Sequence, residues 1–292
     1  MVSVAVIIVT FNSEREIRAC LESISAQNLE DYRVVVVDNA SSDDTVGEIR
    51  LSKADLTLIE NSTNRGFAAA CNQAASAADS EFILLLNPDA RLCDGAVSEL
   101  VSAIRSEDGA GIAGPRLLSE DGRLLPSAYR FPTIFQEIAY LFRLKPILTS
   151  GPFKAIFGKF LSRWFGQFDP HDTRRVVDSV LGACMLIRGE LWRELNGFNE
   201  RFFLFYEEKD FCKRALDAGY RTIFVPDAQA IHEIGASCRS NPTETDIMKR
   251  ESMMRYYRKH KSLCTNVVLW IAVLLSSLFA TRCRMFSRCR NG

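Results

Sequence analysis

The feature that most limits the possible folds is an alternation of short apolar runs with helical segments over residues 2–86. The apolar runs predict four buried strands, at 2–9, 33–37, 56–60 and 82–86. Apolar residues at helical spacing predict the helices between them, at 13–27, 46–51 and 66–78. Strands that are apolar on both faces and joined through helices indicate a mostly parallel α/β sheet with helices on both faces.

Polar residues follow two of these strands where each strand ends. Asp38 closes a run of four valines, and Asp89 follows the last of the four strands after Pro88, which stops it. Right-handed crossovers bring the carboxyl ends of parallel strands to one edge of the sheet, and ligands of such sheets bind beyond that edge. The sequence therefore places both carboxylates where a ligand is expected.

The alternation of strands and helices stops in the second half of the chain and then resumes. Residues 115–175 include a basic, aromatic stretch with weak helical periodicity, broken by Pro146 and Gly151. This stretch fits either a helical subdomain that packs on the sheet or an element that lies on a membrane surface. Regular patterns then return, with strands expected at 176–188 and 221–225 and helices at 190–195 and 207–218.

The composition excludes several classes of protein. The chain has 292 residues, 47% of them hydrophobic, with 36 Lys+Arg against 36 Asp+Glu. These values indicate a globular protein with a sizeable core, and the overall charge gives no reason to expect a nucleic acid as partner. Nine cysteines are scattered without a CxxC pair, which disfavours a structural zinc site or a secreted disulfide framework and indicates reduced thiols in the cytosol.

The two ends of the chain differ in character. The apolar start lacks a basic region before it and ends within ten residues, so a signal peptide is not expected. Residues 266–280 carry no charge and lie between two groups of basic residues. Fifteen residues extend about 22 Å as a helix, against roughly 30 Å for the hydrocarbon core of a bilayer. An anchor in the membrane plane therefore fits at least as well as a full span.

Three polar groups of the first half are candidates for ligand binding. Asp38 lies too early to cap the next helix and could accept a hydrogen bond from a pyrimidine base or a ribose hydroxyl. Arg65 precedes the helix at 66–78 and could meet a diphosphate, although a solvent-facing arginine is also common there. Asp89 could hold Mg²⁺ or Mn²⁺, or could simply complete a Pro-Asp turn.

An acidic cluster follows five apolar or aromatic residues at 202–206. Glu207, Glu208 and Asp210 could compensate the dipole of a helix that starts there. Residues 202–206 are expected to be buried, which would put at least one carboxylate in a partly dry cleft. Adjacent acids there raise one another's pKa, as a general base requires. His232 could be a buried core histidine or a metal ligand.

Five motifs occur along the chain in a fixed order. They read VAVIIVTFNSE, VVVVDNASSDDT, NRGFAAACNQA, LLLNPDA and GACMLIRGELWRELNGFNERFFLFYEEKDFCKRALDAGYRTIFVPDAQAIHEIGAS. In this order they resemble the family-2 glycosyltransferases of the GT-A fold, and within them the bacterial rhamnosyltransferase-like group that builds cell-surface polysaccharides. The resemblance covers roughly residues 3–260 and implies a Rossmann-like, mostly parallel sheet with helices on both faces.

The resemblance also implies a division of the chain. Residues 1–260 would form the glycosyltransferase domain, and 261–292 an apolar helical segment with basic flanks that associates with a membrane. The domain would begin with a nucleotide-sugar half at 1–114. A helical insertion at 115–175 would follow, and then the acceptor and catalytic half at 176–260.

Residue by residue, the resemblance implies three sets of functional groups. The nucleotide sugar would contact the strand ends and the turn before the helix at 66–78, namely Thr10, Asn12, Glu14, Asp38, Asn64, Arg65, Gly66, Asn87 and Asp89. Glu207 and Glu208 match an acidic pair whose second member is the catalytic base, and Asp210 belongs to the same catalytic cluster. Asn87 and Asp89 occupy an Asp-x-Asp metal motif, and Asp89 with His232 would hold Mg²⁺ or Mn²⁺.

Two positions depart from the family pattern. Asn87 replaces the first aspartate of the metal motif, which leaves one formal charge and makes metal binding depend on the diphosphate. Glu208 stands where aspartate is usual, and the extra methylene moves the carboxylate by about one bond length. Glu207 therefore stays open as the alternative base.

The implied function is inverting transfer of a sugar from a nucleoside-diphosphate sugar to a hydroxyl of a growing or polyprenyl-diphosphate-linked glycan. The resemblance favours dTDP-rhamnose over a UDP-sugar as donor, and the cytoplasmic face of the inner membrane as location. A nucleotidyltransferase and a nicotinamide-dependent oxidoreductase are disfavoured because no glycine-rich loop follows the first strand. A membrane-bound scaffold of the same fold without activity is disfavoured by the intact acidic cluster.

Overall fold

A computed structural model describes residues 3–27, 29–52, 54–148, 172–233 and 242–290. The chain divides into two units, Met1–Arg130 with Pro170–Ser252 and Phe131–Asp169 with Met253–Gly292. The first part of the 115–175 stretch, up to Arg130, belongs to the unit that contains the sheet.

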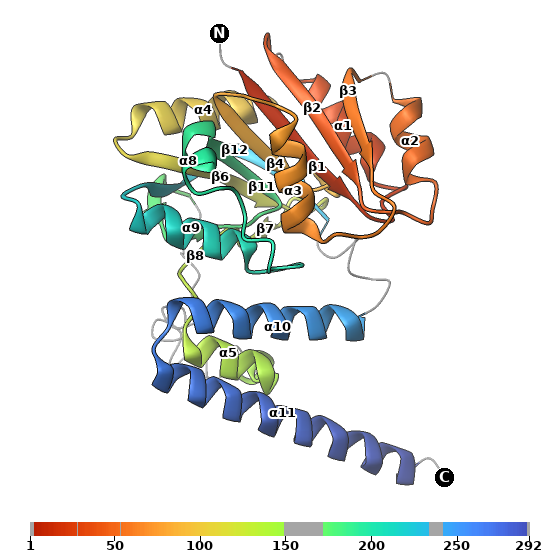
Figure 1. The fold of residues 1–292 in the computed structure, drawn as a ribbon, viewed down its shortest axis with the longest axis vertical. Helices are drawn as coiled ribbons and strands as arrows, with labels where there is room; N and C mark the ends of the chain where they lie inside the picture. The colour runs from red at the N-terminus through yellow and green to blue at the C-terminus, as the bar shows by residue number, and fades with distance from the viewer. Residues whose placement is uncertain (1–2, 28, 53, 149–171, 234–241, 291–292) are drawn as a thin grey trace. The chain divides into compact units, whose positions relative to one another are not determined.

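The first unit is built on one large mixed sheet (Figure 1). Its main strands are β1 (Val4–Thr10), β2 (Tyr32–Asp38), β3 (Leu56–Glu60), β4 (Phe82–Leu86), β5 (Ala90–Leu92), β6 (Ala110–Leu118), β11 (Cys184–Arg188) and β12 (Arg221–His232). They are ordered β3-β2-β1-β4-β11-β6-β12-β5. Four short strands complete the unit, namely β7 (Leu124–Leu125), β8 (Ala128–Tyr129), β9 (Arg175–Val177) and β10 (Ser179–Val180).

Helices cover both faces of this sheet. They are α1 (Ile17–Ser25), α2 (Thr45–Leu51), α3 (Phe67–Ser76), α4 (Ala96–Ser106), α8 (Gly189–Glu194) and α9 (Glu207–Asp217). Val4, Val6 and Ile8 share one core with α1 and α4, whereas Ala5 and Ile7 point to the other face, on which α3 lies (Figure 1). Burial on both faces is the reason for the uninterrupted apolar strands of the sequence.

The sheet is less regular than the sequence predicted. The strands β1 to β4 are parallel, but β11 runs antiparallel to β4 and β6, and β5 runs antiparallel to β12. The single strand expected at 176–188 is wrong: β9, β10 and β11 replace it, and each pairs with different strands. The strand expected at 221–225 continues to His232 through a register shift between Val225 and Gln229.

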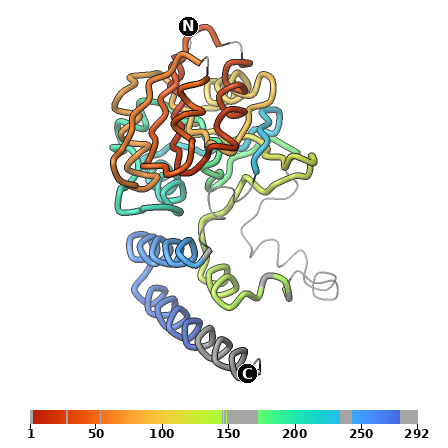
Figure 2. The backbone as a smooth tube through the Cα atoms, turned by 90° about the vertical axis from the view of Figure 1, so that its right-hand side faces the viewer, coloured from red at the N-terminus to blue at the C-terminus, as the bar shows by residue number. Residues whose placement is uncertain are grey.

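The second unit contains helices from both of its chain segments. These helices are α5 (Ile134–Leu141), α6 (Lys145–Leu148) and α11 (Leu263–Arg290), and α10 (Pro242–His260) begins in the first unit and ends in the second. α5 starts with a capping box between Thr133 and Gln136, and α11 packs against α5. α11 is one continuous helix in both views (Figures 1 and 2).

The C-terminal segment is helical, as α11, but the apolar membrane helix that sequence analysis considered there is not supported. In the part of the chain that the structure describes, no helix is both long and apolar enough to cross a bilayer. The basic, aromatic stretch that sequence analysis considered at a membrane surface falls largely on 149–171, outside the described residues. The described cysteines are free thiols, at Cys20, Cys71, Cys93, Cys184, Cys212 and Cys264.

Candidate active site

The carboxyl ends of the parallel strands meet at one edge of the sheet, as the sequence predicts. Thr10 at the end of β1 is paired in register with Asp38 at the end of β2. The Thr10 hydroxyl donates to Asp38 Oδ1 at 2.8 Å, and the main-chain N–H of Asn39 donates to the Thr10 carbonyl at 2.9 Å. Asn87 follows β4, which lies on the other side of β1. Three of the predicted donor-site residues therefore share this edge.

Asp38 organises the loop that follows its strand. The carboxylate is buried, and it also accepts from the Ser41 main-chain N–H at 2.9 Å and from the Ser41 hydroxyl at 2.5 Å. Together with Thr10 this makes three accepted hydrogen bonds, whereas a carboxylate has about four acceptor positions. One position is left for a ligand, which is compatible with recognition of a base or ribose.

Asn12 and Glu14 use their side chains to join the loops after β1 and β2. Asn12 Oδ1 accepts from the Ser42 N–H at 2.8 Å, and Glu14 Oε2 accepts from the Asp44 N–H at 3.2 Å. Asn12 has a left-handed backbone, with φ of 54°. Such conformations are uncommon outside glycine and concentrate at functional sites. The structure thus gives both residues a role in shaping the edge, in addition to any contact with a ligand.

The turn before α3 links this edge to the aromatic run before α9. Asn64 Oδ1 accepts from the Gly66 N–H at 2.9 Å, and the Asn39 amide donates to the Gly66 carbonyl at 3.2 Å. Gly66 has φ of 84°, and a Cβ there would lie 2.7 Å from the Phe203 carbonyl oxygen. Arg65 is exposed at the surface of this turn. The close approach of two backbones explains the glycine.

Gly66→Ala is expected to lower the free energy of unfolding by about 2–4 kcal/mol, because a left-handed alanine is strained and its methyl overlaps Phe203. Gly95 provides the matched control. Gly95 has φ of 69° and ψ of 3°, in the left-handed helical region, and no described atom lies within 4 Å of the place that an added methyl would take. Gly66, with φ of 84° and ψ of 164°, has a conformation that is nearly exclusive to glycine, so Gly95→Ala carries a smaller backbone cost and no overlap. Urea denaturation of both variants measures the difference, and equal losses would contradict the packing of Gly66 on Phe203.

Asp89 and His232 face each other from neighbouring strands. His232 is paired with Ala90 in the β12–β5 ladder, and the Glu233 N–H donates to the Asp89 carbonyl at 3.0 Å. Asp89 Oδ1 lies 3.3 Å from His232 Nε2, and both side chains are buried. Asp89 Oδ1 and His232 Nδ1 have no hydrogen-bond partner within the described residues. The pair is close but is not aligned as a hydrogen bond, so Asp89 Oδ1 and His232 Nε2, 3.3 Å apart, could face one common ligand, whereas Nδ1 points to another side of the ring.

These two residues fit a divalent cation that shares its coordination with a substrate. No group of three or more His, Cys, Asp or Glu side chains suited to a metal occurs in the described ranges. Mg²⁺ and Mn²⁺ are commonly held by one or two protein groups together with substrate phosphates, so two protein ligands suffice. Glu16, at the start of α1, was missed by sequence analysis: burial and the negative charges of Asp89 and Glu233 raise its pKa.

The acidic pair begins helix α9 after an unusual turn. Phe205 and Tyr206 both have left-handed backbones, with φ of 69° and 68°, directly before Glu207. Glu207 and Glu208 are buried, and the Oε2 atom of each lacks a hydrogen-bond partner in the described part of the chain. Burial, reinforced by the charge of Glu208, raises the pKa of Glu207 to about 8. Glu207 therefore carries a proton at neutral pH.

Lys209 pairs with Glu208 and not with Glu207. Its ammonium lies 2.5 Å from Glu208 Oε1 and 5.1 Å from the centre of the Tyr206 ring. Burial alone would lower the pKa of Lys209, but the Glu208 charge more than offsets this, and the pKa is raised. Burial also raises the pKa of Tyr129 on β8, which senses the charges of both Lys209 and Glu208. Lys209 holds one oxygen of the Glu208 side chain and leaves the other oxygen available.

Asp210 differs from the other members of the cluster. It is fully buried, and its Oδ2 accepts from Arg214 Nε at 2.8 Å. Arg214 also donates to the carbonyl groups of Leu195 and Gly197, at 2.8 and 2.7 Å. This network ties α9 to the loop after α8, so the geometry gives Asp210 a structural task.

A turn at Gly182 and Ala183 brings the metal motif and the acidic pair together. The Asn87 N–H donates to the Ala183 carbonyl at 2.9 Å. A Cβ on Gly182 would lie 3.5 Å from the Glu208 Cβ. Glu207 lies on another side, near Cys71 of α3: burial raises the pKa of the Cys71 thiol, and the ionised form of Glu207 raises it further. The two glutamates thus have different surroundings, which no sequence spacing could indicate.

The aromatic run before α9 is only partly buried. Phe202 and Tyr206 are buried, but Phe203 is 36% exposed, so the expectation that the whole run is buried is wrong. The Phe203 carbonyl instead accepts from the Phe67 N–H at 2.7 Å, at the start of α3. Of the residues near the site, Lys209 could have been suspected from its place beside the pair, whereas Tyr129 carries no signal in the sequence.

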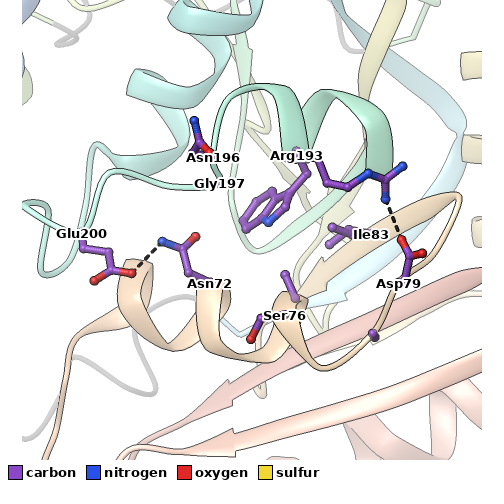
Figure 3. Close-up of a pocket in the computed structure, with 11 residues that line it drawn as sticks. Asn72, Ser76, Asp79, Ile83, Arg193, Asn196, Gly197 and Glu200 are labelled. Carbon is purple, nitrogen blue, oxygen red and sulfur yellow. Dashed lines mark hydrogen bonds and ion pairs between the residues drawn. The ribbon is translucent and has the colours of Figure 1, made fainter.

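A separate hollow of about 520 Å³ lies between α3 and the segment after α8 (Figure 3). Asn72 donates to Glu200 Oε1 at 3.0 Å on one side, and Arg193 pairs with Asp79 at 2.9 Å on the other. Its described lining includes none of the residues that sequence analysis assigned to a site. Four of its polar side chains are paired with one another, and we do not assign the candidate site to this hollow.

Comparisons with known proteins agree with this geometry. The sequence model of "Glycosyl transferase family 2" matches residues 5–164. The chain is 25% identical to the N-acetylglucosaminyl-diphospho-decaprenol L-rhamnosyltransferase of Mycobacterium tuberculosis, over 81% of this chain and 78% of that protein. It is 27% identical to the rhamnosyltransferase WbbL of Escherichia coli K12, over 89% and 94% of the two chains.

Solved structures show the same fold. The mannosyltransferase PcManGT of Pyrobaculum calidifontis, in complex with GDP-Man and Mn²⁺, matches 94% of this chain and 73% of its own, with a TM-score of 0.58 at 18% identity. GalNAc-T7, with UDP, GalNAc and Mn²⁺, matches 80% and 44%, with a TM-score of 0.57 at 16% identity. The GT-A-like α/β fold expected from sequence is confirmed, with a mixed sheet. The chain is a glycosyltransferase and belongs to glycosyl transferase family 2.

Proposed function

We propose that the chain transfers a sugar with inversion from a nucleoside-diphosphate sugar to an acceptor hydroxyl, with Glu208 as the base. One observation carries this proposal: Glu208 is a buried carboxylate with Oε1 on Lys209 and Oε2 without a hydrogen-bond partner in the described chain. A base needs an oxygen that is free to take the proton, and the pairing of Oε1 with Lys209 leaves Oε2 in that position. Glu207, which is protonated at neutral pH, is the weaker candidate.

The mechanism follows from this assignment. Glu208 Oε2 takes the proton of the acceptor hydroxyl as its oxygen attacks the anomeric carbon, from the face opposite the leaving nucleoside diphosphate. Asp89 and His232 would hold Mg²⁺ or Mn²⁺, which supplies positive charge to the leaving diphosphate. Glu207 is placed to donate a hydrogen bond to a sugar hydroxyl. Asp210 holds Arg214 and acts only through the position of α9.

The donor we favour is dTDP-rhamnose, with a UDP-sugar as the alternative. Two relatives named rhamnosyltransferases support it, and the remaining acceptor position of Asp38 suits the N–H of a pyrimidine. Thr10, Asn12 and Glu14 would shape the base pocket, and Asn64, Arg65 and Gly66 would lie along the ribose and diphosphate. Asn87 would contact the sugar side of the diphosphate.

The acceptor we propose is a polyprenyl-diphosphate-linked or growing glycan, for which N-acetylglucosamine on a polyprenyl diphosphate is the first choice. The name of the mycobacterial relative supports it. A Campylobacter jejuni relative, 29% identical over 42% of this chain, is likewise named for a diphospho-undecaprenol-linked substrate. Such acceptors are presented at a membrane, so we place the enzyme at the cytoplasmic face of the inner membrane, attached peripherally.

The test is a thermal-shift panel with dTDP, UDP, GDP and NAD, each with and without Mn²⁺. A ligand at about 100 times its Kd stabilises by about 2.7 kcal/mol, which is a shift of several degrees. We expect shifts with dTDP or UDP that increase with Mn²⁺, and none with NAD. A shift with NAD alone, or with no nucleotide at all, would contradict the proposal.

Asp89→Asn is expected to abolish the Mn²⁺-dependent part of the nucleotide shift and to leave the metal-free part unchanged. The amide keeps the shape of the side chain but removes the charge that a hard cation needs. Asp79→Asn, at an exposed aspartate of the same unit, is the matched control and should behave as wild type. A full Mn²⁺ response in Asp89→Asn would remove Asp89 from the metal site.

Lys209→Met is expected to lower kcat at pH 7 by about 10- to 100-fold, since a hydrogen bond to a charged group contributes about 1.5–3 kcal/mol. The donor KM should stay unchanged, and the acidic limb of the rate profile should move to higher pH. Lys209→Arg should restore the pH profile of wild type. The control is Lys213→Met, which removes a lysine on the same helix that pairs with Asp217. A change in KM alone would show that Lys209 serves donor binding instead.

A further inference from the structure

Helix α11 exposes most of its large apolar side chains and buries one leucine with two small residues. Leu269, Ala272 and Ser276 are buried, at 0, 6 and 4% exposure, on the side that packs against α5. Large apolar side chains point away at helical spacing, and we call them the outer face of α11: Leu263 (80% exposed), Val267 (49%), Trp270 (54%), Ile271 (46%), Leu274 (45%) and Leu278 (63%). A helix in water shows the reverse arrangement, so this face fits an apolar partner.

Charge along the chain indicates what kind of partner this is. Residues 252–292 contain eight Lys and Arg and no Asp or Glu, so this segment carries a charge of +8. Because the whole chain is neutral, residues 1–251 carry −8. Arg258 and Lys259 are exposed in the last turn of α10, shortly before the outer face begins. An apolar face with basic residues before and after it matches an anionic bilayer, whose headgroups attract lysine and arginine.

We propose that the outer face of α11 docks on an anionic lipid bilayer, with the helix axis in the membrane plane. Since α5 covers the opposite side, only the outer face can enter the bilayer. Its apolar residues would reach the boundary between headgroups and acyl chains, with Trp270 at its centre. Pairing of this face with the same face of a second copy is less favourable, because it would bring two +8 segments together. The proposal deepens the membrane location proposed above and rests on it for its biological setting.

The first test is co-sedimentation of the full chain with vesicles of phosphatidylcholine alone and of phosphatidylcholine with 30% phosphatidylglycerol. We expect at least tenfold stronger binding to the anionic vesicles, and weaker binding when salt rises from about 0.1 to 0.5 M. The triple variant Val267→Ser, Ile271→Ser, Leu274→Ser should lose at least tenfold in binding. Leu51→Ser, at an exposed leucine of α2 (69%), is the matched control and should bind as wild type.

The second test reads the depth of Trp270 and needs no destabilising variant. Lipids brominated at different positions along the acyl chain quench tryptophan according to its depth, and Trp270→Phe isolates the signal of this residue. We expect strongest quenching by lipids brominated near the headgroup. Strongest quenching at the bilayer centre would overturn the in-plane arrangement.

Three outcomes would overturn the docking surface itself. The first is that the protein sediments with neither kind of vesicle, and the second is that the triple variant binds vesicles as strongly as wild type. The third is a dimer in sedimentation equilibrium that the triple variant abolishes, which would assign the outer face to a second copy. None of these measurements uses a sugar. Loss of lipid binding and loss of glycosyl transfer can therefore be told apart.

Discussion

Glu208→Gln should reduce kcat by roughly 100- to 10,000-fold, the usual contribution of a general base, while nucleotide binding stays as in wild type. Glutamine keeps the size of the side chain, so Lys209 and the start of α9 retain their neighbours. Only the ability of Oε2 to take the acceptor proton is lost. The measurement is the initial rate of sugar transfer at saturating donor, together with the dTDP or UDP thermal shift.

Two variants make this result specific. Glu207→Gln should reduce kcat much less, because Glu207 already carries a proton at neutral pH. Glu99→Gln, at an exposed glutamate in the first turn of α4, should leave the rate unchanged. If Glu207→Gln were the inactive variant and Glu208→Gln the active one, the roles of the two glutamates would be exchanged.

Glu207→Gln should stabilise the protein at alkaline pH. The pKa of Glu207 is about 8 in the folded state, against 4.5 for its ordinary value, with burial as the main cause. The folded state therefore binds a proton that the unfolded state has released, and wild-type stability falls as pH rises through this window. Glutamine has no proton to lose. The free energy of unfolding of the variant should therefore exceed that of wild type by nothing below pH 4.5 and by a few kcal/mol above pH 8, because a pKa difference of one corresponds to about 1.4 kcal/mol.

Urea denaturation of wild type and Glu207→Gln at several pH values measures this effect. The neighbouring charge of Glu208 is the second cause of the raised pKa, so the same comparison in a Glu208→Gln background should give a smaller pH-dependent difference. Parallel stability profiles for wild type and Glu207→Gln would mean that Glu207 is ionised in the folded protein at neutral pH.

The strands and helices of the nucleotide half were predictable because each has a strong periodicity. The runs that became β1, β2 and β4 are largely buried on both faces, whereas the edge strand β3 is half-buried to exposed. The α1 residues Ile17, Cys20, Leu21 and Ile24 are spaced for one buried side. The second half was less predictable because its pairing is decided by distant contacts. The apolar run at 176–188 contains Asp178 and Gly182, and its pieces pair with β12, β8 and β4.

The candidate site shows the same limit. Sequence could indicate that Asp38 and Asp89 lie at strand ends, since strand position is a local property. It could not separate the roles of Glu207 and Glu208, because their difference comes from Lys209 and Tyr129 on one side and Cys71 on the other. Asp210 looked like a member of the catalytic cluster until Arg214 was seen to hold it. Burial and tertiary partners, which spacing does not encode, make these distinctions.

The most direct measurement of the central claim is a transfer assay read by mass spectrometry. The full chain is incubated with dTDP-rhamnose, Mn²⁺ and N-acetylglucosamine linked to a polyprenyl diphosphate, beside parallel reactions with UDP-sugars and with the Glu208→Gln variant. The expected result is an acceptor lipid heavier by one sugar, formed by wild type and not by the variant, with release of the nucleoside diphosphate. An acceptor that stays unmodified with every donor, by a protein that still binds the nucleotides, would contradict the proposed transfer. Equal product from wild type and Glu208→Gln would contradict the assigned base.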